Sequence, residues 1–275
     1  MTENDSTKAA PGKRRLMDIP ELRRIDIGAG PECLLLGLRD FMKAPKYGLF
    51  FGGIYALGGW LIVGLVVWLS MPYFAYPAAM GFALIAPFVA AGLYEVSRRL
   101  EVGQPLSWNV VLGTVWRQKG RDLGWMALIT GFAFFIWVDY AAIIFLVFFG
   151  LREMQPEVFL EALTTTRDGL YFLLLGNIAG AVIAAIVFSI TVISFPLLMD
   201  REIDFATAMT ASVRAVTANP LPMAVWAAII GLCLLGAFIT FLIALPVILP
   251  VLGHATWHMY RKVVAATVHS EAERL

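Results

Sequence analysis

Two histidines near the end of a long apolar run, His254 and His258, are the residues whose type and spacing could bind a metal ion or haem. On a helix, residues four apart lie on one face with their Cβ atoms about 6 Å apart. The pair therefore cannot supply the two opposite axial positions of one haem. Zinc prefers four ligands, or three ligands and a water, and Glu95 is the carboxylate expected at a similar depth. A His254/His258/Glu95 metal site stays open, but we expect the protein to carry no cofactor.

The residues after each histidine suggest a simpler explanation. Aromatic and basic side chains mark the level where a membrane helix reaches the headgroups, and this stretch holds Trp257, Tyr260, Arg261 and Lys262. We expect these four residues to form an interfacial anchor, with the histidines hydrogen-bonded to neighbouring helices.

A second group of polar residues lies inside apolar runs. Asp139 is an ionisable residue within an expected span, and such residues are candidates for ion or proton sites. Its neighbours Trp137 and Tyr140 are typical of a membrane interface instead. Hydroxyls at Ser189, Thr191 and Ser194 could line a polar path or bridge helices. Asp139 with these hydroxyls is the possible polar membrane site.

No pattern of catalytic residues is present. The sequence has no Walker-type glycine loop, no Gly-x-Ser-x-Gly elbow, no His-Glu-x-x-His and no cysteine-rich ligand set. We therefore expect that the protein is not an enzyme.

Composition defines the class of protein. Hydrophobic residues make up 60% of the chain and charged residues 15%, and the mean hydropathy is +0.77. This leaves too little polar surface to cover a soluble globule of 275 residues. The chain is expected to be an integral membrane protein. Because its net charge is only +1, we expect that it does not bind nucleic acid.

Six apolar runs approach the ~20 residues that a membrane-spanning helix needs. We predict an all-α, polytopic bundle with spans at 47–70, 73–97, 123–149, 170–198, 222–243 and 245–262. Pro246 and Pro250 offer the break that a tight hairpin would use between the last two, so the stretch 222–262 is either two full spans or one span and a re-entrant segment. The expected domains are a disordered basic tail (1–30), one membrane domain (31–262) and a short tail (263–275).

Flanking charge predicts the orientation. Residues 1–46 hold nine Lys and Arg and the loop 98–122 holds five, whereas 150–169 holds two against four acidic residues. Because basic loops favour the cytoplasm, both termini are expected there.

Similar segments recur along the chain. Residues 37–48 align with 113–124 at an offset of 76, and residues 87–99 align with 250–262 at an offset of 163. These matches suggest three hairpin units, each with an interfacial amphipathic helix before two spans. The interfacial helices are expected at 31–43, 106–118 and 203–217.

Three stretches carry a resemblance to a known family: Glu95–Gly103, Phe195–Arg201 and, above all, Gly253-His-Ala-Thr-Trp-His-Met-Tyr-Arg261. They resemble a bacterial family of predicted integral membrane proteins of unknown function, over about residues 20–265. The resemblance implies a multi-span protein of the bacterial inner membrane and no specific activity.

Together these patterns favour a non-enzymatic structural or accessory component, whose partners are membrane lipid and other membrane proteins or further copies of itself. Two alternatives remain. One is a small-solute or ion transporter or channel that uses Asp139 and the hydroxyls. The other is a haem- or metal-carrying accessory of a respiratory complex that uses His254 and His258.

Overall fold

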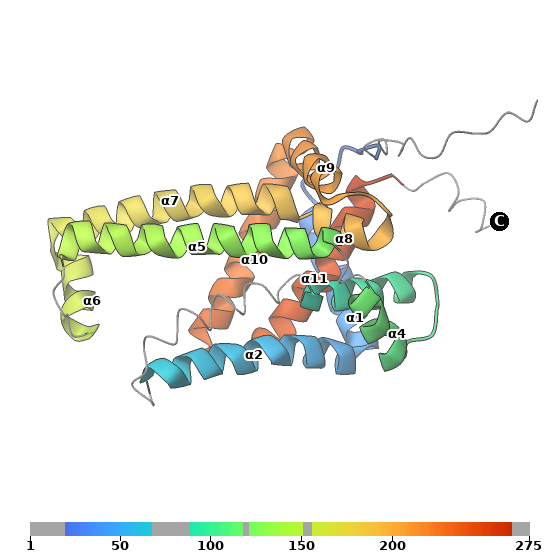
Figure 1. Ribbon diagram of the computed structural model, residues 1–275, viewed down its shortest axis with the longest axis horizontal. Coiled ribbons are helices and arrows are strands. Elements are labelled where there is room, and N and C mark those ends of the chain that lie inside the picture. Colours follow the sequence, from blue (N-terminus) through green and yellow to red (C-terminus); the bar gives the residue numbers. More distant parts are fainter. Residues whose placement is uncertain (1–19, 68–87, 118–120, 151–155, 266–275) are drawn as a thin grey trace, which may run out of the picture.

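The computed structural model describes residues 20–67, 88–117, 121–150 and 156–265 (Figure 1). Within these residues the regular structure is helical, apart from one antiparallel bridge between Leu22 and Val264. The predicted all-α class is confirmed for this part of the chain.

The labelled helices follow in chain order and differ greatly in length. They are α1 (Ala29–Lys43), α2 (Pro45–Val67), α4 (Trp108–Arg117), α5 (Arg121–Phe149), α6 (Pro156–Thr165), α7 (Arg167–Thr191), α8 (Ser194–Asp200), α9 (Phe205–Ala218), α10 (Pro220–Ile239) and α11 (Leu245–Val263). A further helical segment covers residues 88–101.

Four stretches of the described chain are long and apolar enough to cross a membrane: Pro45–Leu65, Asp122–Phe149, Arg167–Asp200 and Pro220–Ile239. The predicted count of six spans is therefore not confirmed. Most of the expected span 73–97 lies outside the described residues. The expected span 245–262 forms α11, but α11 is not among the four, and it carries two histidines, Arg261 and Lys262.

The stretch 222–262 divides into two helices, and the division comes before the prolines. Phe241 and Leu242 have φ of 49° and 65°, a left-handed conformation that ends α10 and turns the chain. Pro246 then lies in the first turn of α11, where no backbone donor is needed. Pro250 lies inside α11, so the carbonyl of Pro246 loses its partner within the helix. Gly52 of α2 packs against that carbonyl, where an added Cβ would lie only 2.6 Å from the oxygen.

A break between α7 and α8 shows how a freed backbone group is satisfied. Pro196 cannot donate to the carbonyl four residues earlier, and the helix is interrupted at Val192 and Ile193. The backbone N–H of Ile193 donates instead to Ser212 Oγ of α9 at 3.2 Å, and Ser212 is fully buried. The backbone donor at this break is thus satisfied by the neighbouring helix α9.

Three short helices gather at one end of the long axis. Helices α1, α4 and α9 lie at the end where the first and last described residues pair, and α5 and α7 run side by side toward the other end, where α6 turns away from them (Figure 1). Helices form at all three places where interfacial helices were expected. The three-unit repeat itself is not confirmed.

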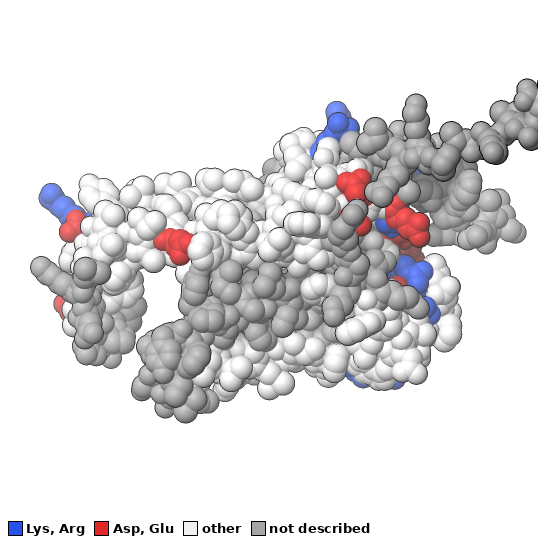
Figure 2. Space-filling view, in the orientation of Figure 1, with Lys and Arg blue, Asp and Glu red and all other residues white. Residues whose placement is uncertain are grey.

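Charged side chains are also concentrated toward the two ends. Figure 2 shows a largely uncharged surface between them, interrupted by one acidic patch on the visible face. This distribution suits a protein whose middle lies in hydrocarbon.

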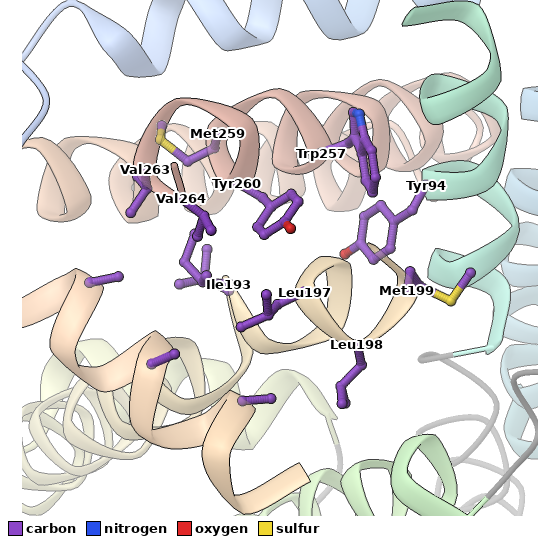
Figure 3. Packing of buried hydrophobic residues seen from close by; sticks show 14 of the residues in the cluster. Tyr94, Ile193, Leu197, Leu198, Met199, Trp257, Met259, Tyr260, Val263 and Val264 are labelled. Carbon is purple, nitrogen blue, oxygen red and sulfur yellow. The ribbon is translucent and has the colours of Figure 1, made fainter. Parts of the chain in front are cut away.

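The main core lies at the end where the short helices gather. Side chains from residues 88–101, α8 and α11 meet there, including Tyr94, Ile193, Leu197, Trp257 and Tyr260 (Figure 3). All five are at most 6% exposed. The core therefore joins helices that are far apart in sequence.

Candidate functional site

Four polar side chains from three helices meet beside this core. His258 Nε2 lies 2.8 Å from Asp40 Oδ2, and Ser97 Oγ lies 2.8 Å from both Asp40 Oδ2 and His254 Nδ1. Asp40 belongs to α1, Ser97 to the segment 88–101, and the histidines to α11. We call Asp40, Ser97, His254 and His258 the polar cluster.

Glycines allow the helices to approach closely enough for these short side chains to meet. A Cβ added to Gly37 of α1 would lie 2.5 Å from the Val251 carbonyl oxygen and 2.6 Å from the Ala255 nitrogen of α11. A Cβ added to Gly253 would lie 2.6 Å from Leu93. Real Cβ atoms do not approach a backbone this closely, so the contact between α1 and α11 requires glycine at position 37.

The hydrogen bonds of the polar cluster indicate which of its atoms carry protons. Ser97 has one hydroxyl proton, which it donates to Asp40, so Ser97 Oγ accepts from His254 Nδ1–H. This assignment leaves His254 Nε2 without a proton, and no described residue gives that buried nitrogen a hydrogen bond. His258 in turn donates its Nε2–H to Asp40.

The environment of Asp40 favours its ionised form. Burial opposes the charge, but the hydrogen bond and charge of His258, with the bond from Ser97, outweigh burial and hold the pKa of Asp40 below its ordinary value. The carboxylate is thus the charged centre of the polar cluster.

Glu95 does not join the histidines. Its carboxylate binds Arg98 Nε at 2.8 Å and Arg99 Nε at 2.7 Å. Among the described residues, no group of three or more His, Cys, Asp or Glu side chains is arranged to hold a metal ion. The structure therefore does not assemble the His254/His258/Glu95 candidate.

The four expected anchor residues bind other helices. Trp257 Nε1–H donates to Glu101 at 3.1 Å, and the Tyr260 hydroxyl donates to Asp200 at 2.6 Å. Arg261 bridges the same two carboxylates, and Lys262 binds Glu32 of α1 at 2.8 Å. Trp257 and Tyr260 are fully buried in the protein. They fasten α11 to its neighbours, whereas a lipid-facing anchor would have left them exposed.

The polar residues within the spans do not form one site. The hydroxyls of Ser189, Thr191 and Ser194 donate to carbonyls of the preceding helical turn, each at 2.6 Å. Asp139 is exposed on α5. An apolar cavity of about 610 Å³ between α5, α7, α8 and Ala90 includes Thr191 but not Asp139.

Sequence reasoning missed Asp40 and Ser97. A usable signal existed for Asp40, because it continues the buried stripe of α1 that contains Cys33 and Gly37. An acidic residue on the apolar face of an amphipathic helix indicates a buried polar partner. Ser97 offered no comparable signal.

Comparison with known proteins bears on the middle of the chain. Residues 75–200 match a family model described as predicted integral membrane protein (DUF2189). The expected resemblance to a family of integral membrane proteins of unknown function is thereby confirmed. The match includes the Glu95–Gly103 stretch and α5, and it ends before the motif at 253–261. No curated protein and no solved structure matches the chain.

Proposed function

We propose that the protein is a non-enzymatic component of the bacterial inner membrane that packs against other membrane proteins. The observation that supports this most is the arm formed by α5 and α7. Within this arm α5 is the more exposed helix: 6% of the residues in the most apolar window of Asp122–Phe149 are buried, against 39% for Arg167–Asp200, which contains α7. Large apolar side chains cover the surface of the arm, among them Phe132, Ile143, Leu174 and Ile178.

The polar cluster fits a structural role in such a component. Ser97 and His254 are fully buried, and Asp40 is 5% exposed. A substrate cannot reach the serine hydroxyl or the bare imidazole nitrogen without separating α1 from α11. The cluster's hydrogen bonds instead fix the relative position of three helices.

The two alternatives receive less support from the geometry. A transport site would need Asp139 and the hydroxyls to share a cavity, and in the described part of the chain they do not. A respiratory accessory would need imidazole nitrogens that are free to bind a haem or metal. Of the four imidazole nitrogens of His254 and His258, two already bind protein atoms: His254 Nδ1 binds Ser97 and His258 Nε2 binds Asp40. A third, His254 Nε2, is buried.

A visible absorption spectrum and metal analysis of protein purified in mild detergent test the respiratory alternative. We expect no Soret band and no stoichiometric metal. We also expect that replacing both histidines (His254→Gln with His258→Gln) lowers the thermal midpoint without removing a chromophore. A Soret band, or about one bound metal per chain, that is lost in the double variant would support the respiratory accessory instead.

The proposal includes the arrangement expected from sequence: six spans in three hairpin units, with both termini in the cytoplasm. Support comes from the clustering of α1, α4 and α9 at one end of the long axis (Figure 1). Backbone pairing of Leu22 with Val264 also keeps the two ends of the described chain on the same side.

Crosslinking in native membranes tests the packing role. A photoreactive amino acid at Phe132 of α5 or Ile178 of α7, both exposed, is expected to give a discrete adduct with another membrane protein. The same amino acid at buried Trp226 provides the matched control and is expected to give none. Adducts with lipid alone from every exposed position of α2, α5, α7 and α10 would contradict a protein partner.

A further inference from the structure

Asp139 is a charged residue inside a candidate span, and no contact in the described part of the chain accounts for it. It is exposed on α5, and no hydrogen bond or ion pair with another described residue engages its carboxylate. The neighbouring residues Trp137, Tyr140 and Ile144 face α7: Trp137 Nε1 lies 3.5 Å from the Cβ position of Gly180, the Tyr140 hydroxyl donates to the Leu175 carbonyl at 3.5 Å, and Ile144 packs on Gly176. Asp139 points away from this side of the helix.

Asp139 also lies deep within its span. It is about 5 Å from the midpoint of Asp122–Phe149 at roughly 1.5 Å per residue. A hydrocarbon layer about 30 Å thick centred on this helix would place Asp139 some 10 Å inside its boundary. The residues after Asp139, up to Phe149, belong to the same helix and are apolar apart from the Tyr140 hydroxyl, so the aspartate lies within the apolar stretch and not at its end.

A regular stripe surrounds Asp139 on the exposed face. Leu128, Phe132, Phe135, Asp139, Ala142 and Leu146 are all exposed and follow one another at spacings of four and three residues. Such spacing places the six side chains on one face of the helix, where a neighbouring helix could pack against all of them. A single polar residue within a helix-packing seam selects the partner and its register.

We propose that this stripe of α5 binds a transmembrane helix of another protein that carries a Lys or Arg at mid-membrane depth. An exposed carboxylate in hydrocarbon is strongly unfavourable, and a cation at the same depth relieves that cost. A second copy of this chain would instead bring two carboxylates together. The inference rests on the proposed packing role and names the partner's chemistry.

A synthetic helix tests the recognition directly. The purified full chain, with a donor dye at its N-terminus, is placed in phosphatidylcholine vesicles with an acceptor-labelled polyleucine peptide of about 22 residues, long enough to span. One peptide has a central Lys and the other a central Leu. We expect the Lys peptide to bind on the order of tenfold more tightly, and Asp139→Leu to abolish this preference.

Two further variants keep the test decisive. Asp168→Leu removes an exposed acid at the start of α7, away from the stripe, and should leave the preference unchanged. Asp139→Lys should reverse the preference, so that a peptide with a central Glu binds best, and this gain of binding cannot result from misfolding. Equal affinities for the Lys and Leu peptides, or no binding of either, would overturn the proposal. Asp139-dependent self-association of the chain in peptide-free vesicles would also overturn it and identify a second copy as the partner.

The peptide-binding test of this inference and the crosslinking test of the packing role can fail independently. If native-membrane crosslinks form through α2 or α10 while the peptide preference is absent, the packing role stands and this inference fails. If no protein crosslink forms anywhere although the Lys peptide is preferred, the recognition is real and the packing role fails.

Discussion

At the scale of residues, the polar cluster depends on one carboxylate. Asp40 accepts hydrogen bonds from Ser97 and His258, and through Ser97 it also positions His254. Both partners lose a charged acceptor if Asp40 is removed, and buried polar groups without partners are destabilising.

We therefore expect Asp40→Ala to lower the free energy of unfolding by about 1–3 kcal/mol. Chemical denaturation followed by tryptophan fluorescence in detergent would measure the change. Glu202→Ala is the control, because Glu202 is exposed and should cost little. Equal effects of the two substitutions would show that the cluster contributes nothing specific to stability.

The lowered pKa of Asp40 predicts how stability depends on pH. Because the folded pKa lies below the unfolded value of about 3.9, ionised Asp40 stabilises the fold above that pH, and the contribution is lost as the pH falls through the folded pKa. The thermal midpoint of the wild type should fall more steeply below about pH 4 than that of Asp40→Asn. Parallel curves for the two proteins would contradict the assignment.

At the scale of elements, the contact between α1 and α11 sets the tolerance for added volume. Gly37 has no space for a methyl group, because the atoms it would meet are backbone atoms of α11. Gly53 of α2 has open space, with nothing within 4 Å of an added Cβ.

Gly37→Ala is expected to push α1 from α11 and to lower stability by about 1–3 kcal/mol, as overpacking does. Gly53→Ala is the matched control and should be neutral or slightly stabilising, since alanine favours helix. Thermal unfolding of both variants in one detergent gives the comparison. A Gly37→Ala protein as stable as Gly53→Ala would mean that the two helices can separate without loss.

At the scale of the whole molecule, the clustering of α1, α4 and α9 predicts one polar side. Reporter proteins fused after residue 30, within 101–107, within 201–204 and after residue 265 should all report cytoplasm. A reporter within 156–165, at α6, should report periplasm. A periplasmic report from the fusion after residue 265 would contradict an even number of spans.

Much of this architecture could be predicted from sequence, because apolar length and flanking charge act locally. The positions of α5, α10 and the three short helices followed from such patterns. The role of the segment 253–261 did not, because it depends on residues such as Asp40, Glu101 and Asp200 that are distant in sequence. Spacing alone showed that His254 and His258 share a face. It could not show that the face turns inward to α1 and to Ser97.

The pairing of Leu22 with Val264 has a consequence for synthesis. The backbone N–H of Arg23 donates to the Val263 carbonyl at 2.7 Å, and that of Ala265 donates to the Glu21 carbonyl at 3.0 Å. During translation, the segment before α1 and the side of α1 that packs on α11 therefore cannot form these contacts until α11 has left the ribosome. A ribosome that stalls after α10 would release a chain in which Gly37 faces no helix and Asp40 lacks His258. Quality-control proteases that sense unassembled membrane helices are expected to recognise that uncovered side of α1.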